Sequence, residues 1–198
     1  MDCGVGDVPL NPGPTTNRPA QISSKFAPRN YNSARNKTVS LHSGPLHLGL
    51  LNCRSAVNKI ALIHDLINDR NLHVTFLSET WFTSDTPQSM LLDLAPSGYA
   101  ALHVVRPTGP GKPSRGGGLA AVFRESVPVR VHHLASNVQL PTTFELQLLR
   151  VDAAGTGSST PFTVVHVYRP PWMSTVSTFV DELADIGMSD KRRRSAAR

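Results

Sequence analysis

From Leu46 to Leu77 the chain reads LHLGLLNCRSAVNKIALIHDLINDRNLHVTFL. The apolar residues 46–51 predict a strand, and the apolar residues 74–77 predict a second strand that is short and buried. Between the two, apolar residues recur at helical spacing, which predicts a helix from about Ser55 to Asn71. A strand, a helix and a strand in so short a span are typical of a βαβ unit, in which the two strands run parallel.

The second half of the chain is dominated by strand patterns that turn residues separate. A loop rich in Gly, Pro and Lys spans residues 106–118. Gly116-Gly117-Gly118 lacks the Gly-Lys-Ser/Thr ending of a phosphate loop, so we interpret it as a flexible entry into the following strand. An amphipathic helix is expected at residues 176–186. The strands are expected at residues 99–105, 119–123, 127–132, 144–151 and 162–168.

Composition divides the chain into three parts. Residues 1–44 are rich in Pro, Asn, Ser, Thr and Arg and lack apolar periodicity, so we expect a disordered head. Residues 45–187 are expected to form one domain, and residues 188–198 a basic tail that includes Lys191-Arg192-Arg193-Arg194. The net charge of +6 and the pI of about 9.8 favour polyanionic partners such as nucleic acid or an anionic membrane.

Several classes of protein are disfavoured by what the sequence lacks. Cys3 and Cys53 form neither a disulfide framework nor a zinc pattern, and the eight histidines form no ligand cluster. No apolar run reaches the length of a membrane span, and the first residues do not resemble a signal peptide. The sequence therefore predicts an intracellular protein, nuclear or cytoplasmic, with no membrane partner and no small-molecule cofactor.

Two polar residues follow the first two predicted strands. Asn52 comes directly after the first strand, and Glu79 follows the second after Ser78. In a parallel βαβ unit both lie at the carboxyl edge of the sheet, where ligand sites gather. A carboxylate there suits a hard cation such as Mg²⁺. Spacing alone favours the simpler interpretation, in which Asn52 caps a turn and Glu79 is a solvated loop residue.

Tyr168 ends the last predicted strand and precedes Arg169-Pro170-Pro171. A tyrosine hydroxyl at a strand end can donate a hydrogen bond to a phosphate or polarise a nucleophile. More often such a tyrosine lies at the edge of the core with its hydroxyl in water. Both interpretations remain open from the residue alone.

Four segments together resemble motifs of one superfamily. They are Leu50-Leu51-Asn52-Cys53-Arg54-Ser55 with Lys59, Phe76-Leu77-Ser78-Glu79-Thr80-Trp81-Phe82, Arg115-Gly116-Gly117-Gly118-Leu119-Ala120 and Val167-Tyr168-Arg169-Pro170-Pro171. In this order they resemble the endonuclease/exonuclease/phosphatase superfamily, and within it the apurinic-like endonuclease domain of non-LTR (LINE-type) retrotransposons.

The resemblance implies a deoxyribonuclease I-like fold, a four-layer α+β or α/β arrangement of two packed β-sheets flanked by helices. It implies Asn52, Glu79 and Tyr168 as catalytic residues, with Glu79 and Asn52 at a Mg²⁺ ion and Tyr168 near the scissile phosphate. The implied reaction is hydrolysis of a DNA phosphodiester by water, which nicks one strand, and the implied role of the nick is to prime reverse transcription.

The family's later motifs, a Gly-Asp-Phe-Asn stretch and an aspartate and histidine pair, have no counterpart here. We therefore expect a domain truncated at the C-terminus, with weak or no nuclease activity. The head adds a second resemblance, since residues 7–14, DVPLNPGP, resemble ribosome-skipping peptides that also occur in some retrotransposons. Pro9 stands where that family has glutamate, so we expect an inactive remnant.

Two alternatives follow from the same residues. The chain could be a non-catalytic fragment that binds nucleic acid through its basic residues, in which case binding would depend on salt and not on Glu79. It could also be a phosphatase of the same superfamily. The Thr80-Trp81 pair after Glu79 and the Arg-Pro-Pro after Tyr168 favour the retrotransposon branch over the phosphatases.

Overall fold

The computed structural model describes residues 45–106, 116–134, 138–152, 160–171 and 176–196, with side chains of the last range described to residue 188. These residues belong to one compact unit, residues 36–198. The expected disordered head at 1–44 lies outside the described residues. Within the described ranges, no helix is both long and apolar enough to cross a bilayer.

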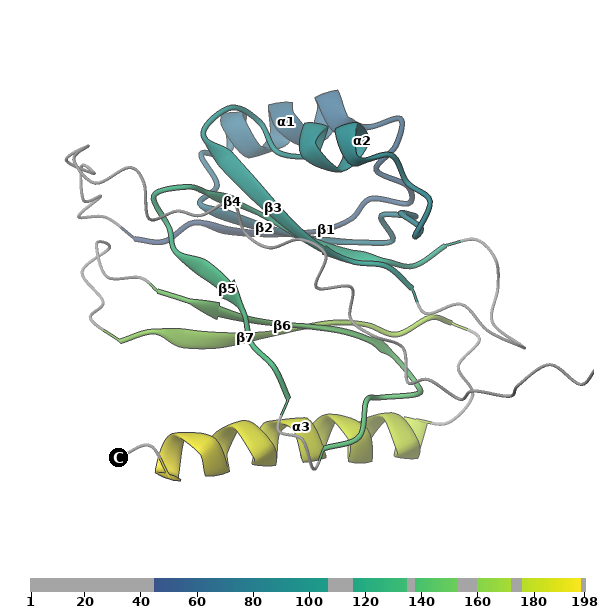
Figure 1. The fold of residues 1–198 in the computed structure, drawn as a ribbon, viewed down its shortest axis with the longest axis vertical. Helices are drawn as coiled ribbons and strands as arrows, with labels where there is room; N and C mark the ends of the chain where they lie inside the picture. Colours follow the sequence, from purple (N-terminus) through teal and green to yellow (C-terminus); the bar gives the residue numbers. More distant parts are fainter. Residues whose placement is uncertain (1–44, 107–115, 135–137, 153–159, 172–175, 197–198) are drawn as a thin grey trace, which may run out of the picture. The chain divides into compact units, whose positions relative to one another are not determined.

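Two sheets form the centre of the fold (Figure 1). The first sheet has the strand order β1-β2-β4-β3, and the second has the order β5-β6-β7. β1 and β2 run parallel, as the βαβ pattern predicted, and the other paired strands are antiparallel. The strands are β1 (Leu48–Asn52), β2 (Val74–Ser78), β3 (Tyr99–Val104), β4 (Leu119–Arg124), β5 (Val129–Val131), β6 (Glu145–Val151) and β7 (Phe162–Tyr168).

Successive side chains of a strand point to opposite faces of its sheet and so pack into the apolar layers on both sides. In β2, Phe76 packs between the two sheets, whereas Leu77 faces the helix α1 (Ile60–Asp69). In β6, Leu149 packs between the sheets, whereas Leu148 faces the helix α3 (Val176–Ala196). This period of two lets each sheet contribute to two apolar layers. The prediction of two sheets flanked by helices is therefore confirmed, with α1 over the first sheet and α3 over the second (Figure 1).

The helices differ from the sequence predictions in three places. α1 begins at Ile60 instead of near Ser55, because Arg54 and Ser55 have φ values of 42° and 80°, which no right-handed helix contains. A six-residue helix, α2 (Gln88–Asp93), was not predicted. α3 continues to Ala196, so most of the expected basic tail is helical. After Gly187 the sequence contains no Gly or Pro that would end a helix, and Lys, Arg and Ala favour it.

Candidate active site at the ends of three strands

Asn52 and Glu79 lie side by side at the carboxyl edge of the first sheet, as the parallel pairing predicted. Asn52 is the last residue of β1 and is in register with Ser78, the residue before Glu79. The amide Nδ2 of Asn52 donates a hydrogen bond to Oε1 of Glu79 at 3.1 Å. Its Oδ1 accepts the backbone N–H of Arg54 at 3.2 Å, so Asn52 holds both the carboxylate and the following turn.

Tyr168 reaches the same carboxylate from the second sheet. It is the last residue of β7, and its hydroxyl donates a hydrogen bond to Oε1 of Glu79. Two of the residues singled out from the sequence, Asn52 and Tyr168, therefore converge on one carboxylate oxygen of the third, Glu79, from strands in different sheets. Their catalytic roles, and the role of Asn52 as a metal ligand, stay predictions.

The surroundings of Glu79 favour its ionised form. Burial alone would raise the pKa of this carboxyl, but hydrogen bonds from Tyr168, Asn52 and Trp81 and the positive charge of Arg54 outweigh burial and leave the pKa below its usual value. Burial, the hydrogen bond to Glu79 and its negative charge raise the pKa of Tyr168 to about 12. At neutral pH the site therefore pairs a carboxylate with a neutral hydroxyl donor.

The backbone around the site has unusual conformations. Of the five non-glycine residues with positive φ in the described ranges, four lie here, namely Arg54, Ser55, Glu79 and Trp81. A left-handed conformation costs an L-residue roughly 1 kcal/mol or more, so surrounding contacts must hold it. Such conformations concentrate at functional sites, which agrees with the position of Glu79.

Backbone hydrogen bonds continue beyond the ends of β1 and β2 and hold this conformation. Ser55 N–H donates to Glu79 O at 2.7 Å, and Ala56 N–H donates to Thr80 O at 2.9 Å. Lys59 donates through Nζ to the carbonyls of Cys53 and Arg54 at 2.6 and 2.9 Å. Lys59, which is part of the first motif, therefore stabilises the turn that follows β1.

Cys53 lies beneath the turn and is unsuited to act as a nucleophile. Its side chain is buried, and burial raises the pKa of the thiol to about 11. The protonated thiol lies 3.3 Å from the carbonyl oxygen of Ser78 and 3.4 Å from that of Glu79, and it donates to them. Cys53 therefore supports the Glu79 backbone.

Sequence reasoning missed two residues beside the site, Arg106 and Glu145. Nε of Arg106 lies 2.5 Å from Oε1 of Glu145, and both side chains are less than a tenth exposed. The glycine run Gly116–Gly118, interpreted as a flexible entry to a strand, packs against this ion pair with φ values of 90°, 70° and 84°. Those three adjacent glycines were the signal in the sequence, because side chains rarely tolerate such backbone angles.

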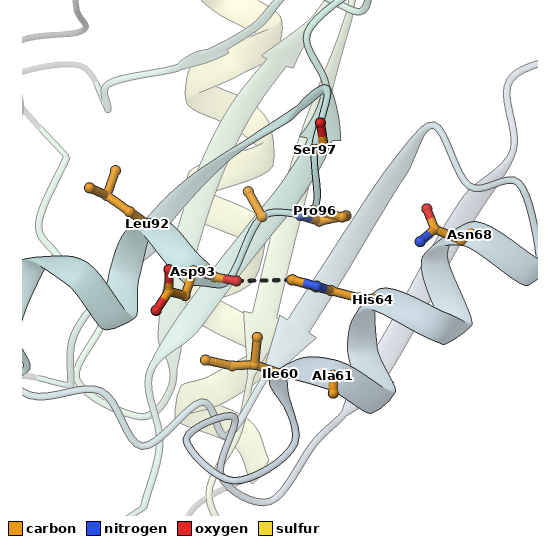
Figure 2. Close-up of a pocket in the computed structure, with 9 residues that line it drawn as sticks. Ile60, Ala61, His64, Asn68, Leu92, Asp93, Pro96 and Ser97 are labelled. Atoms are coloured by element: carbon orange, nitrogen blue, oxygen red, sulfur yellow. Dashed lines mark hydrogen bonds between the residues drawn. The ribbon is translucent and has the colours of Figure 1, made fainter.

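A separate open groove lies between α1 and the segment from α2 to Ser97 (Figure 2). Its lining includes Ile60, His64, Leu92 and Pro96. Nε2 of His64 lies 2.9 Å from the carbonyl oxygen of Asp93 and therefore donates to it across the groove. None of the three candidate site residues lines this groove.

A metal ion at the site would depend chiefly on Glu79. The ionised carboxylate of Glu79 is a hard oxygen donor of the kind that suits Mg²⁺, whereas Asn52 turns its Nδ2 toward Glu79 and uses Oδ1 to accept the N–H of Arg54. Within the described residues, no group of three His, Cys, Asp or Glu side chains is placed to hold a metal. Since Mg²⁺ is usually held by one or two carboxylates plus water and substrate phosphate, Glu79 meets the lower limit of what such an ion needs.

Comparison with known proteins gives matches at the level of solved structures. No protein-family model matches the sequence, and no curated protein matches it. The chain is similar to the human Nocturnin catalytic domain with bound sulfate (TM-score 0.47, 17% identity, 76% of this chain and 61% of that chain). It is also similar to the 3′ phosphatase NExo from Neisseria bound to a product DNA hairpin (TM-score 0.46, 14% identity, 76% and 53%).

A third similar structure is an endonuclease/exonuclease/phosphatase family protein from Leptotrichia buccalis, with a TM-score of 0.41 and 13% identity. That match covers 71% of this chain and 62% of the other. The chain thus spans between 53% and 62% of the length of these three structures.

Proposed function

We propose that this chain carries part of a Mg²⁺-dependent site for phosphodiester hydrolysis, of the endonuclease/exonuclease/phosphatase type, with DNA as substrate. The observation that supports the proposal best is the convergence of Asn52 and Tyr168 on Oε1 of Glu79. An isolated solvated glutamate would not need donors from two strands in different sheets. The arrangement is that of a carboxylate held in one orientation for a ligand.

Glu79 would hold the Mg²⁺ ion, with Asn52 beside it. When bound, such an ion supplies positive charge that stabilises a phosphate during attack by water. Because the surroundings lower the pKa of Glu79, this carboxylate stays ionised at neutral and mildly acidic pH. It therefore offers a full negative charge to the cation without first losing a proton.

The other residues of the site suit a phosphate group. Tyr168 keeps its proton at neutral pH, since its pKa is raised to about 12, and so acts as a hydrogen-bond donor. Arg54 is exposed, and its positive charge acts on Glu79. A guanidinium beside a metal-binding carboxylate attracts phosphate and can bond it through two N–H groups.

Hydrolysis by these groups should be slow. A carboxylate with a lowered pKa is a weak base, and a tyrosine with a raised pKa is also a poor one at neutral pH. Loss of an efficient general base typically costs about a hundredfold to ten-thousandfold in rate. We therefore expect this site to bind metal and phosphate and to catalyse hydrolysis only weakly.

The order of the four motifs supports the retrotransposon branch of the superfamily. Thr80-Trp81-Phe82 follows the carboxylate, and Arg169-Pro170-Pro171 follows the tyrosine, as in those endonuclease domains. The net charge of +6 supports DNA as the polyanionic partner. We propose DNA nicking of the kind that precedes reverse transcription as the function of the lineage.

Nicking of supercoiled plasmid in Mg²⁺ tests the proposal. We expect slow nicking that EDTA abolishes, that Glu79→Ala loses, and that Glu182→Gln retains, because Glu182 bonds to Thr142 and Thr143 on another part of the fold. Equal nicking by the parent chain and Glu79→Ala would overturn the proposal and point to a contaminating nuclease.

Two other outcomes would replace the proposal with an alternative. Absence of nicking together with salt-sensitive DNA binding that Glu79→Ala leaves unchanged would assign a non-catalytic nucleic-acid-binding role. Release of phosphate from small phosphomonoesters without plasmid nicking would assign a phosphatase. The basic charge favours the binding role over the phosphatase.

A further inference from the structure

Glu145 is a buried carboxylate close to the site but not part of it. It stands directly opposite Tyr168 in the register of β6 and β7. Its Oε1 pairs with Nε of Arg106 at 2.5 Å, and its Oε2 accepts the backbone N–H of Gly118 at 2.6 Å. Both carboxylate oxygens of Glu145 thus take part in bonds within the fold.

The glycine run is shaped around this ion pair. A Cβ added to Gly117 would overlap both Arg106 Nε and Glu145 Oε1. A Cβ added to Gly118 would lie 2.6 Å from Oγ1 of Thr80. Since both glycines also have positive φ, no other residue type fits here without strain. The backbone of the run is therefore held tightly against Glu145.

The same run holds the backbone that carries Glu79. The N–H of Thr80 donates to the carbonyl of Gly118 at 3.2 Å, and the N–H of Trp81 donates to the carbonyl of Gly117 at 2.8 Å. Glu79 and Trp81 both have left-handed φ, at 56° and 61°. A continuous series of hydrogen bonds therefore runs from the carboxylate of Glu145 to the strained turn.

We propose that Glu145, through its ion pair with Arg106 and its bond to Gly118, is the positioning residue that holds Glu79 in its ligand-binding orientation. The consequence of these Glu145 contacts for metal binding rests on the proposed function, whereas their effect on the turn does not. A carboxylate that bonds a backbone N–H and a guanidinium forms charge-assisted bonds, which are stronger than neutral ones. Such bonds can offset the strain of two left-handed residues.

Amide hydrogen exchange of the full chain, measured by NMR, tests the hold on the turn without any metal. Glu145→Gln should raise the exchange rates of the Thr80 and Trp81 amides at least about tenfold relative to that of Leu77 in β2. Glu182→Gln is the matched control, because Glu182 also accepts backbone and hydroxyl bonds, from Thr142 and Thr143. It should leave the relative rates of Thr80 and Trp81 unchanged.

Arg106→Lys keeps the positive charge but lacks the planar fork of the guanidinium, and it tests the same contact if Glu145→Gln fails to fold. It should raise the same two exchange rates by a smaller factor. Unchanged relative rates for Thr80 and Trp81 in the folded variants would overturn the proposal. Equal increases in Glu182→Gln would also overturn it, because the effect would then be one of general stability.

Mn²⁺ affinity, followed by electron paramagnetic resonance, tests the consequence for Glu79. If the parent chain binds Mn²⁺, Glu145→Gln should weaken binding several-fold although Glu79 is intact, and Glu182→Gln should not. Unchanged affinity with faster exchange would overturn the positioning of the carboxylate. If the parent chain binds no Mn²⁺, the proposed function fails, whereas the exchange rates still decide the hold on the turn.

Discussion

The hydroxyl of Tyr168 donates a hydrogen bond to Oε1 of Glu79, although 89 residues separate the two in the chain. The bond joins the end of a strand in one sheet to the residue after a strand in the other. It therefore exists only when the two sheets are packed together. The candidate site therefore requires both packed sheets, and neither sheet forms it alone.

Removing this donor should change the titration of Glu79. Tyr168→Phe deletes a hydrogen bond that stabilises the ionised carboxylate, so the pKa of Glu79 should rise toward its ordinary value of 4.5. Carbon-13 NMR of the Glu79 carboxyl during an acid titration measures this. Tyr99→Phe is the control, since the Tyr99 hydroxyl donates to Leu72 O elsewhere and should leave Glu79 unchanged. No difference between the two variants would contradict the assigned bond.

Acid should destabilise the fold partly through His166. Burial lowers the pKa of this histidine from 6.5 to about 4, because the charged ring would be desolvated between the sheets. Below pH 6.5 the histidine of the unfolded chain binds a proton, whereas that of the folded chain stays neutral until about pH 4. The contribution of His166 to the free energy of unfolding is therefore complete above pH 6.5 and is lost as pH falls through about 4, and the loss is at most roughly 3 kcal/mol. Urea unfolding between pH 7 and 4 measures the slope.

His166→Asn provides the comparison for the acid slope. Nδ1 of His166 lies 3.2 Å from Oε1 of Gln147, and an asparagine amide can replace that donor without titrating. The variant should lose stability less steeply between pH 6.5 and 4 than the parent. If both chains lose stability with the same slope, His166 is not the group responsible.

Gly117→Ala should be more harmful than another substitution at a glycine of similar φ. Gly98 has a φ of 79° and open space around its added Cβ, so Gly98→Ala should cost only conformational strain, about 1 kcal/mol. Gly117, with a φ of 70°, would also force apart the buried Arg106–Glu145 pair, so its cost should reach about 3 kcal/mol or more. Thermal unfolding of both variants compares them, and equal costs would contradict the packing of Gly117 on the ion pair.

The layer between the sheets should carry much of the stability. Leu149 is fully buried there, and Leu149→Ala should lower the free energy of unfolding by about 2 to 5 kcal/mol. Leu50 in β1 is 75% exposed, so Leu50→Ala should change it by no more than about 0.5 kcal/mol. Denaturant unfolding measures both. A large effect at Leu50 would mean that β1 is covered by contacts other than those described.

The sequence predicted the strands and the proximity of Asn52 to Glu79 for a physical reason. Apolar runs of strand length identify β1 and β2, and parallel pairing brings their carboxyl ends to one edge. Tyr168 was added to that site only through the resemblance to a family. Nothing in the periodicity of β7 indicates which residue of the first sheet the Tyr168 hydroxyl will contact.

The structural features that the sequence did not predict leave no periodic pattern in it. Arg106 and Glu145 are 39 residues apart, and a single ion pair between distant segments leaves no pattern in either one. α2 has only six residues, which is too short for helical spacing to be evident. The start of α1 was placed too early because the left-handed turn at Arg54 and Ser55 depends on bonds to Glu79 and Thr80, which tertiary structure supplies.

Titration of Mn²⁺ as a substitute for Mg²⁺, followed by electron paramagnetic resonance, measures whether Glu79 holds a divalent cation. The parent chain is compared with Glu79→Gln, which keeps the shape of the side chain and removes its charge. We predict that the parent binds Mn²⁺ weakly and that Glu79→Gln does not bind it. Equal binding by both chains, or no binding by the parent, would contradict the assignment of Glu79 as the metal-holding residue of a phosphodiester-hydrolysing site.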